Sequence, residues 1–150
     1  MSRWLATTVF CCLLVTIRPL EAAEDPGLKQ LLDRYEAALR KADVAAVIAL
    51  YEADGDFVSY AGRHASGAAQ LREFYSGVVR RGGLDHSSTI DRVRWLGKAA
   101  AIVDGSFEIR RPSGAPLKGY WTAVVTRKGR SYLFRAVRTW TVSDGAGDAR

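Results

Sequence analysis

Residues 31–75 read LLDRYEAALRKADVAAVIALYEADGDFVSYAGRHASGAAQLREFY, and this stretch decides the fold of the chain. Around its beginning, apolar residues recur at the three- and four-residue spacing of an amphipathic helix. Asp25-Pro26 stands just upstream, as a capping residue followed by a proline suited to the first helical turn. We therefore predict a helix that begins at this pair and ends near Lys41.

The remainder of the same stretch predicts a shorter helix, a short strand and a third helix. Asp43 caps the shorter helix, whose apolar face carries Tyr51 and which ends at Asp54-Gly55. A short extended segment follows over residues 57–60. The third helix covers residues 68–79 and ends before a pair of arginines and a pair of glycines.

The chain after the third helix predicts strands. Turn residues separate four extended segments, which cover residues 86–96, 99–110, 118–127 and 131–142. Three N-terminal helices followed by a meander predict an α+β domain, in which a cone-shaped, curved antiparallel sheet wraps helices packed on one face. We place this domain over residues 23–142 and interpret residues 143–150, rich in glycine, aspartate and alanine, as a flexible tail.

The N-terminus has the layout of a secretory signal peptide. Arg3 precedes an uncharged apolar run over residues 5–17, which is shorter than the ~20 residues that a membrane-spanning helix needs. We predict cleavage after Ala22, so that residues 1–22 are removed and the exported protein, periplasmic or secreted, keeps no stable membrane span. An uncleaved N-terminal anchor is the alternative, because Leu20 is large for its place in a cleavage site.

Composition and motifs exclude several classes of function. The formal net charge of +6 over 150 residues raises nucleic acid as a partner, but the basic residues are spread over the ends of predicted elements, so we expect none. Both cysteines, Cys11 and Cys12, lie in the predicted signal peptide. No phosphate loop, dinucleotide motif or histidine spacing typical of a metal site occurs, and we expect neither cofactor nor metal.

The order of elements resembles the nuclear transport factor two-like superfamily, also called SnoaL-like, and within it the ketosteroid isomerases. The residues that carry this resemblance lie in the quoted stretch and are Ala42-Asp43, Leu50-Tyr51, Asp54, Gly62, Gly67, Leu71, Phe74 and Tyr75. The resemblance implies the cone-shaped fold. It does not imply one reaction, because the superfamily includes isomerases, dehydratases, hydrolases, cyclases and binding proteins without activity.

The isomerase resemblance assigns roles to three residues. Such an enzyme uses a carboxylate base and acidic donors that stabilise an oxyanion. The resemblance implies that Tyr35 is the helix donor and that the second donor falls near Tyr120. The base position holds Ser59, and a lone serine is no base near neutral pH. Asp56 is a poor replacement, since on a strand it faces away from Ser59.

Strand alternation suggests the wall of a ligand pocket. With Tyr120 inward, the same analogy turns Phe107 inward, and Arg138 and Trp140 share a face on the last strand. Together with Ser59 they form an amphipathic pocket with a cationic floor for a small apolar or anionic molecule. The alternative is that Arg138 lies on the outer face or is neutralised by Asp54 or Asp104.

The function therefore has three candidates. We favour an exported protein that binds a small molecule. The second candidate is a lyase, isomerase or hydrolase that uses Tyr35 and Tyr120 with either His64, in the loop before the third helix, or Asp56 through water; His64 is alternatively a solvated loop residue. The third is a dimerising cell-envelope module.

A homodimer is expected through the outer sheet face. The apolar residues that alternation assigns to that face are Ile102, Trp121, Ala123, Val125, Leu133 and Val137.

Overall fold

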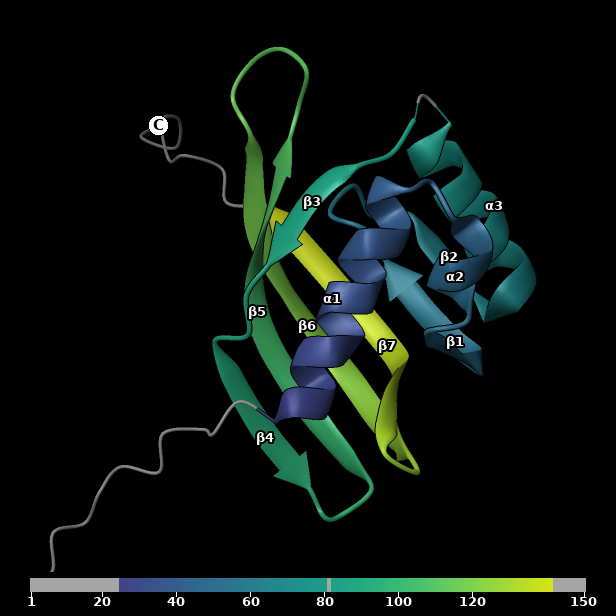
Figure 1. Ribbon diagram of the computed structural model, residues 1–150, viewed down its shortest axis with the longest axis vertical. Helices are drawn as coiled ribbons and strands as arrows, with labels where there is room; N and C mark the ends of the chain where they lie inside the picture. Colours follow the sequence, from purple (N-terminus) through teal and green to yellow (C-terminus); the bar gives the residue numbers. More distant parts are fainter. Residues whose placement is uncertain (1–24, 81, 142–150) are drawn as a thin grey trace, which may run out of the picture.

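The computed structural model describes residues 25–80 and 82–141, which form three helices and one curved sheet (Figure 1). The helices are α1 (Pro26–Arg40), α2 (Val44–Ile48) and α3 (Gly67–Val79). The strands are β1 (Tyr51–Val58), β2 (His64–Ser66), β3 (Asp85–Ser88), β4 (Arg92–Leu96), β5 (Ala100–Arg110), β6 (Leu117–Lys128) and β7 (Ser131–Thr141). In the described part of the chain, no helix is long and apolar enough to cross a membrane.

Local side-chain chemistry sets the helix starts as the sequence predicted. The Asp25 carboxylate accepts a hydrogen bond from the Gly27 amide, and Asp43 accepts one from the Ala46 amide. The second helix is shorter than predicted, however, because α2 ends at Ile48. Tyr51 is the first residue of β1 and does not lie on a helix face, so the short strand begins six residues earlier than expected.

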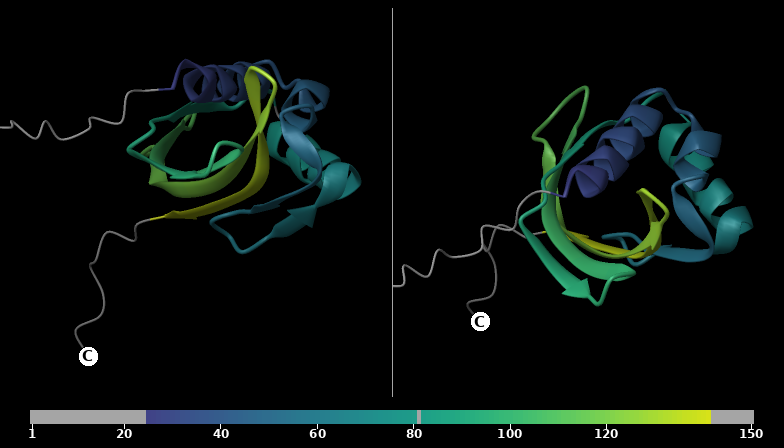
Figure 2. Two further views of the ribbon diagram at one scale, coloured as in Figure 1. Left: turned by 90° about the horizontal axis from the view of Figure 1, so that it is seen from below. Right: turned by 60° about the horizontal axis from the view of Figure 1, so that its bottom comes forward.

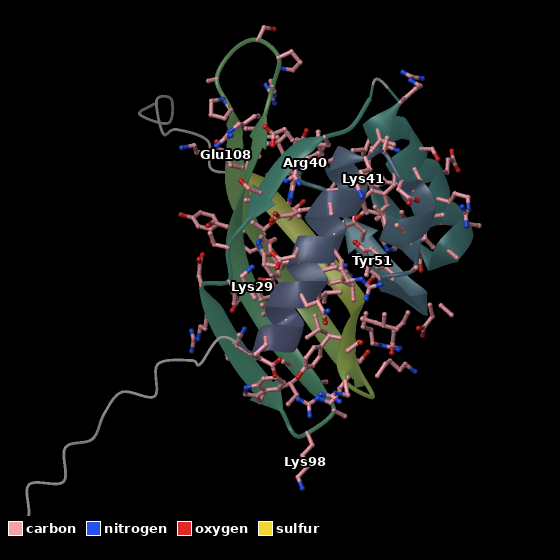
Figure 3. The ribbon with its side chains drawn as sticks, in the orientation of Figure 1. Lys29, Arg40, Lys41, Tyr51, Lys98 and Glu108 are labelled. Atoms are coloured by element: carbon pink, nitrogen blue, oxygen red, sulfur yellow. The ribbon has the colours of Figure 1, made fainter. Side chains whose placement is uncertain are left out.

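The sheet has the strand order β2-β1-β7-β6-β5-β3, with β4 paired to the other half of β5. All neighbours are antiparallel except β1 and β7, which run parallel; β2, α3 and the strands β3 to β6 lie between them along the chain. The helices lie on the concave side, as the α+β prediction requires (Figure 2). Lys98, in the turn after β4, and Glu108, near the end of β5, mark opposite ends of the cone (Figure 3).

The predicted strand over residues 86–96 is in fact two strands, and a glycine accounts for the break. β3 pairs with residues 107–110 of β5, and β4 pairs with residues 100–104. Between them the chain passes over Gly105, where a Cβ would overlap the Thr89 carbonyl oxygen and lie 2.7 Å from the Trp121 indole. Only a residue without a side chain allows that close approach.

The helices pack into the sheet through a single apolar core. Leu31, Leu39 and Leu71 of the helices are each at most 3 % exposed, and they meet a concave face whose buried residues include Val103, Phe107, Trp121, Ala123 and Val125. At the start of α1, the Tyr132 hydroxyl donates to Asp25 over 2.8 Å and so ties the helix cap to β7. The core thus holds α1 lengthwise across the strands.

A bulge in β7 decides which side chains enter the cone. Val125 of β6 pairs with Phe134, whereas its neighbour Val124 pairs with Ala136, so Arg135 is an extra residue. As a result Phe134 and Val137 are both buried although they are three positions apart. Beyond the bulge the alternation is reversed, and every second residue from Arg138 onward faces outward.

The outer face consequently differs from the predicted one. Four residues assigned to it are buried on the concave side, namely Trp121, Ala123, Val125 and Val137. On β6 the predicted alternation was shifted by one residue, which turns the whole strand over. The homodimer stays a prediction, and its predicted surface is wrong at these positions.

Gly105→Ala should lower the free energy of unfolding by about 1–3 kcal/mol, because the added methyl group has no space against Thr89 and Trp121. Gly77→Ala is the matched control within α3, since a Cβ at Gly77 meets no atom within 4 Å. The control should raise the free energy of unfolding by about 0.5–1 kcal/mol through helix propensity. Urea denaturation of both variants measures the difference, and equal stability of the two would contradict the close approach at Gly105.

Candidate functional site

A cavity of about 760 Å³ lies between the helices and the concave face of the sheet. Helices α1 and α3 supply one wall, strands β5 to β7 supply the other, and the turns after β1 and β5 border it. The residues at the end of β5, beyond Glu108, lie at the opposite end of the cone from the Lys98 turn (Figure 3). The size is that of pockets that hold small organic molecules.

Three tyrosines from three elements join in one hydrogen-bond network beside this cavity. The Tyr75 hydroxyl of α3 lies 3.0 Å from the Tyr35 hydroxyl of α1 and 2.6 Å from the Tyr51 hydroxyl of β1. Burial raises the pKa of Tyr35 to about 12 and holds the pKa values of Tyr51 and Tyr75 well above the ordinary range. All three are therefore neutral at pH 7. When Tyr51 donates to Tyr75 and Tyr75 to Tyr35, the Tyr35 proton is left for a ligand.

The network explains why one sequence prediction was incomplete. Tyr35 lines the cavity, as predicted, but its partners Tyr51 and Tyr75 were read only as apolar-face residues of helices. Helical spacing explains Tyr75 as a core residue equally well. Only the packing of α3 on β1 brings its hydroxyl to the other two.

His86 lines the cavity, whereas the histidine predicted for the site, His64, does not. The His86 ring stacks on Phe107 with 5.9 Å between centroids and 12° between planes, and it meets Tyr35 edge-on at 5.6 Å. Burial lowers the pKa of His86 to about 4, so the ring is neutral at pH 7. Its position follows from strand pairing, since His86 lies opposite Ile109, on the face of the sheet that also carries Phe107.

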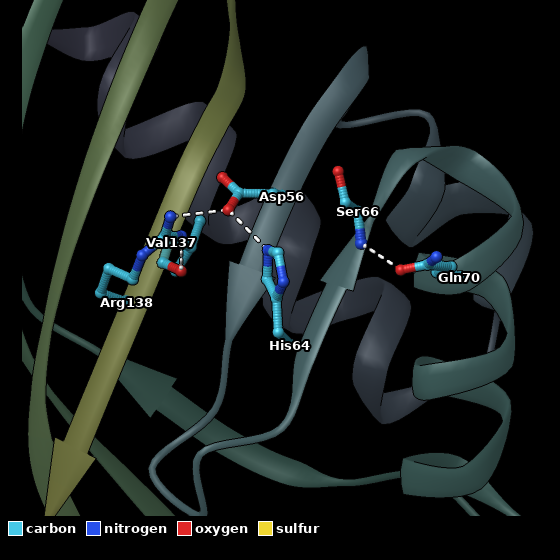
Figure 4. Close-up of polar contacts among 6 residues, drawn as sticks. All are labelled: Asp56, His64, Ser66, Gln70, Val137 and Arg138. Carbon is cyan, nitrogen blue, oxygen red and sulfur yellow. Dashed lines mark hydrogen bonds and ion pairs between the residues drawn. The ribbon is translucent and has the colours of Figure 1, made fainter.

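His64 lies on the outer side of the sheet, where Figure 4 shows it beside Asp56 and Arg138. One Asp56 oxygen lies 3.1 Å from His64 Nε2 and accepts a hydrogen bond of 2.6 Å from Arg138 Nη2. Burial alone would raise the pKa of Asp56, but the hydrogen bonds from Arg138 and His64 together bring it below the ordinary value. The predicted cationic floor is wrong: Arg138 points outward and is neutralised by an aspartate. His64 and Asp56 do not face the cavity either.

Tyr120 and Trp140 also lie outside the cavity. Each is 46 % exposed, and their rings face one another on the outer surface with centroids 6.2 Å apart. Tyr120 is turned outward because its neighbours Gly119 and Trp121 occupy the concave face, and Trp140 because of the bulge at Arg135. Their predicted roles as oxyanion donor and pocket residue are therefore wrong.

Ser59 and Phe107 do line the cavity. Ser59 is 7 % exposed, and its hydroxyl accepts a hydrogen bond of 3.1 Å from the Arg63 amide across a tight turn. Among the described residues that line the cavity, Asp85 is the only carboxylate, and it lies at an exposed edge. Among the described residues, the site thus has a neutral hydrogen-bonding wall and no buried carboxylate base.

The described ranges contain no group of three or more histidine, cysteine, aspartate or glutamate residues arranged to hold a metal ion.

His86→Phe should flatten the pH dependence of stability below neutral pH. The pKa of His86 in the folded state is about 4, below its unfolded value, so folding favours the neutral ring. Its contribution is present above about pH 6.5 and lost as the pH falls towards 4, a change of about 3 kcal/mol in the free energy of unfolding. Denaturation of both proteins between about pH 4 and 7 measures this. Parallel stability curves would contradict the buried neutral ring.

Known proteins share this fold. A protein of unknown function from Shewanella oneidensis, described as nuclear transport factor two-like, is 19 % identical, with a TM-score of 0.67 over 77 % of this chain and 97 % of its own. A ketosteroid isomerase-like protein from Erwinia carotovora atroseptica is 23 % identical, with a TM-score of 0.67 over 81 % and 98 %. A hexachlorocyclohexane dehydrochlorinase is 11 % identical, with a TM-score of 0.67 over 81 % and 87 %.

At these identities the structures establish the fold and no activity. No curated protein matches the sequence. The family of SnoaL-like domains matches residues 32–146, which include the second half of α1, the helices α2 and α3, the tyrosine network and every described strand. The chain therefore belongs to the SnoaL-like domain family.

Proposed function

We propose that this protein binds a small, mainly apolar molecule in the cone cavity. The observation that carries the proposal is the cavity itself, about 760 Å³ in volume and walled by buried aromatic and aliphatic side chains such as Phe57, Phe74 and Phe107. Apolar cavities with a few placed polar groups are the usual form of small-molecule sites.

The polar groups of the wall suggest how such a ligand is oriented. Tyr35 is neutral, and its hydroxyl is fixed by Tyr75, so it offers a hydrogen bond in a set direction. Ser59 adds a second hydroxyl. A carbonyl or hydroxyl oxygen on the ligand fits this wall, since an unpaired polar group would be costly to bury there.

An enzyme of the isomerase or lyase type is the second candidate. It is favoured by one observation, the placement of His86 and Tyr35 on the same wall with their rings 5.6 Å apart. A pKa of about 4 makes His86 a weak base at neutral pH, and the base position of the isomerases holds Ser59. Binding without catalysis therefore has the stronger support.

We further propose that the protein is exported after removal of residues 1–22, which lie outside the described residues.

Intact-mass measurement on protein recovered from the periplasm of a Gram-negative host should show a chain that begins at Ala23. Replacing Leu13 and Leu14 by arginine should keep the full-length chain inside the cell, because a charged run is not recognised as a signal. A full-length chain in the membrane fraction would instead support the uncleaved anchor.

The neutral fluorophore N-phenyl-1-naphthylamine tests the cavity. It should bind with a gain in fluorescence, and Val78→Trp, which adds a large side chain to the α3 wall, should weaken binding at least about tenfold. Ile102→Trp is the matched control, because Ile102 is absent from the cavity wall and pairs with Val124 on the outer side of the sheet. Equal loss in both variants, or none in either, would exclude the cavity as the binding site.

The hydroxyl of Tyr35 is tested with Prodan, a neutral naphthalene that carries a ketone. Tyr35→Phe should weaken Prodan binding about three- to tenfold, the value of one hydrogen bond, and leave N-phenyl-1-naphthylamine binding unchanged. Fluorescence titration of both probes measures the ratio of the two affinities. An equal effect on both probes would mean that Tyr35 contributes shape and not a hydrogen bond.

A further inference from the structure

Three arginines border the cavity, although the predicted cationic floor does not exist. Arg63 belongs to the turn between β1 and β2, and Arg110 and Arg111 lie at the end of β5. The one carboxylate among the described residues of the same wall is Asp85. The border of the cavity therefore carries an excess of positive charge.

The three arginines differ in how far they are neutralised. Arg110 is shared between Asp85, at 3.9 Å, and Glu108, at 3.4 Å. Among the described residues, neither Arg63 nor Arg111 has a carboxylate within 4.0 Å. Two guanidinium groups at the border are thus available to an anion.

Arg63 is held towards the cavity and is not a free surface side chain. Its guanidinium carbon lies 4.8 Å from the centre of the Phe74 ring, and Phe74 is a buried residue of the cavity wall. Its backbone is fixed by hydrogen bonds in both directions with Ser59. A guanidinium stacked on an aromatic ring keeps its N–H groups free to bind a carboxylate, sulfonate or phosphate group.

We propose that the cavity takes an amphiphilic anion, whose apolar body lies against Phe57, Phe74 and Phe107 while its acidic group binds Arg63 and Arg111. This inference rests on the proposed binding function and adds the chemical class of the ligand. It assigns to two border residues the charge recognition that the sequence had suggested for Arg138. A neutral ligand of the same shape gains the apolar contacts alone.

Two probes of nearly identical shape separate the inference from the proposed function. 1-Anilinonaphthalene-8-sulfonate is N-phenyl-1-naphthylamine with one added sulfonate. The anionic probe should bind more tightly than the neutral one at low ionic strength, and the difference should shrink as salt is raised, because exposed charges are screened. An affinity ratio that does not change with salt would overturn the inference, and this test needs no variant.

Variants locate the charge. Arg63→Gln and Arg111→Gln should each weaken binding of the anionic probe about two- to fivefold more than binding of the neutral probe, and the double variant should increase this difference. Arg130→Gln is the control. It removes the same charge in the turn between β6 and β7, which does not line the cavity, and should change the affinity for neither probe. Val78→Trp should weaken binding of both probes at least about tenfold.

The outcomes are distinct. Neutral-probe binding that is blocked by Val78→Trp, with an anionic probe insensitive to both border variants, would overturn the amphiphilic-anion inference and leave the proposed function standing. Failure of the neutral probe to bind would contradict the proposed function itself. An anionic probe that binds the Val78→Trp variant with unchanged affinity lies outside the cavity, and that result also overturns the inference.

Discussion

One extra residue in β7, Arg135, determines which side chains enter the cone. Contacts with β1 and the residue before it hold this bulge in place. The Arg135 guanidinium binds Glu52 at 2.7 Å and Asp54 at 2.9 Å. The Phe134 amide donates a hydrogen bond of 2.8 Å to the Leu50 carbonyl. The bulge allows Phe134 and Val137 to point inward together and turns Arg138 and Trp140 out. The polarity of the cavity follows from it, because an inward Arg138 would have placed a charge among the aromatic residues.

The cavity is consequently neutral inside and positively charged at its border. Tyr35, Tyr51 and Tyr75 share their protons in a buried network, and His86 is kept uncharged by the same burial. Such a wall can orient an oxygen atom, and the carboxylate among its described residues, Asp85, lies at an exposed edge. The fold alone does not separate binding from catalysis, since related folds carry both kinds of function.

The sequence predicted the parts of the fold that depend on neighbouring residues. Two helix starts were predicted correctly, from Asp25-Pro26 and from Asp43, because capping and proline geometry act within one turn of a helix. It placed Phe107 inward correctly, but not Tyr120 or Arg138. Each of the two failures comes from one residue of register, in β6 and at the bulge in β7, and a shift of one residue exchanges the two faces of a strand.

From the sequence alone follow the starts of α1 and α2, the α+β class and three members of the cavity wall, Tyr35, Ser59 and Phe107. Tertiary structure decided which histidine faces the cavity, which arginines border it and that three distant tyrosines share one network. The difference lies in how far apart along the chain the interacting residues are. Capping and periodicity are local, whereas a side chain's face on a sheet depends on pairing with strands far along the chain, where a glycine such as Gly105 or an extra residue such as Arg135 changes the register.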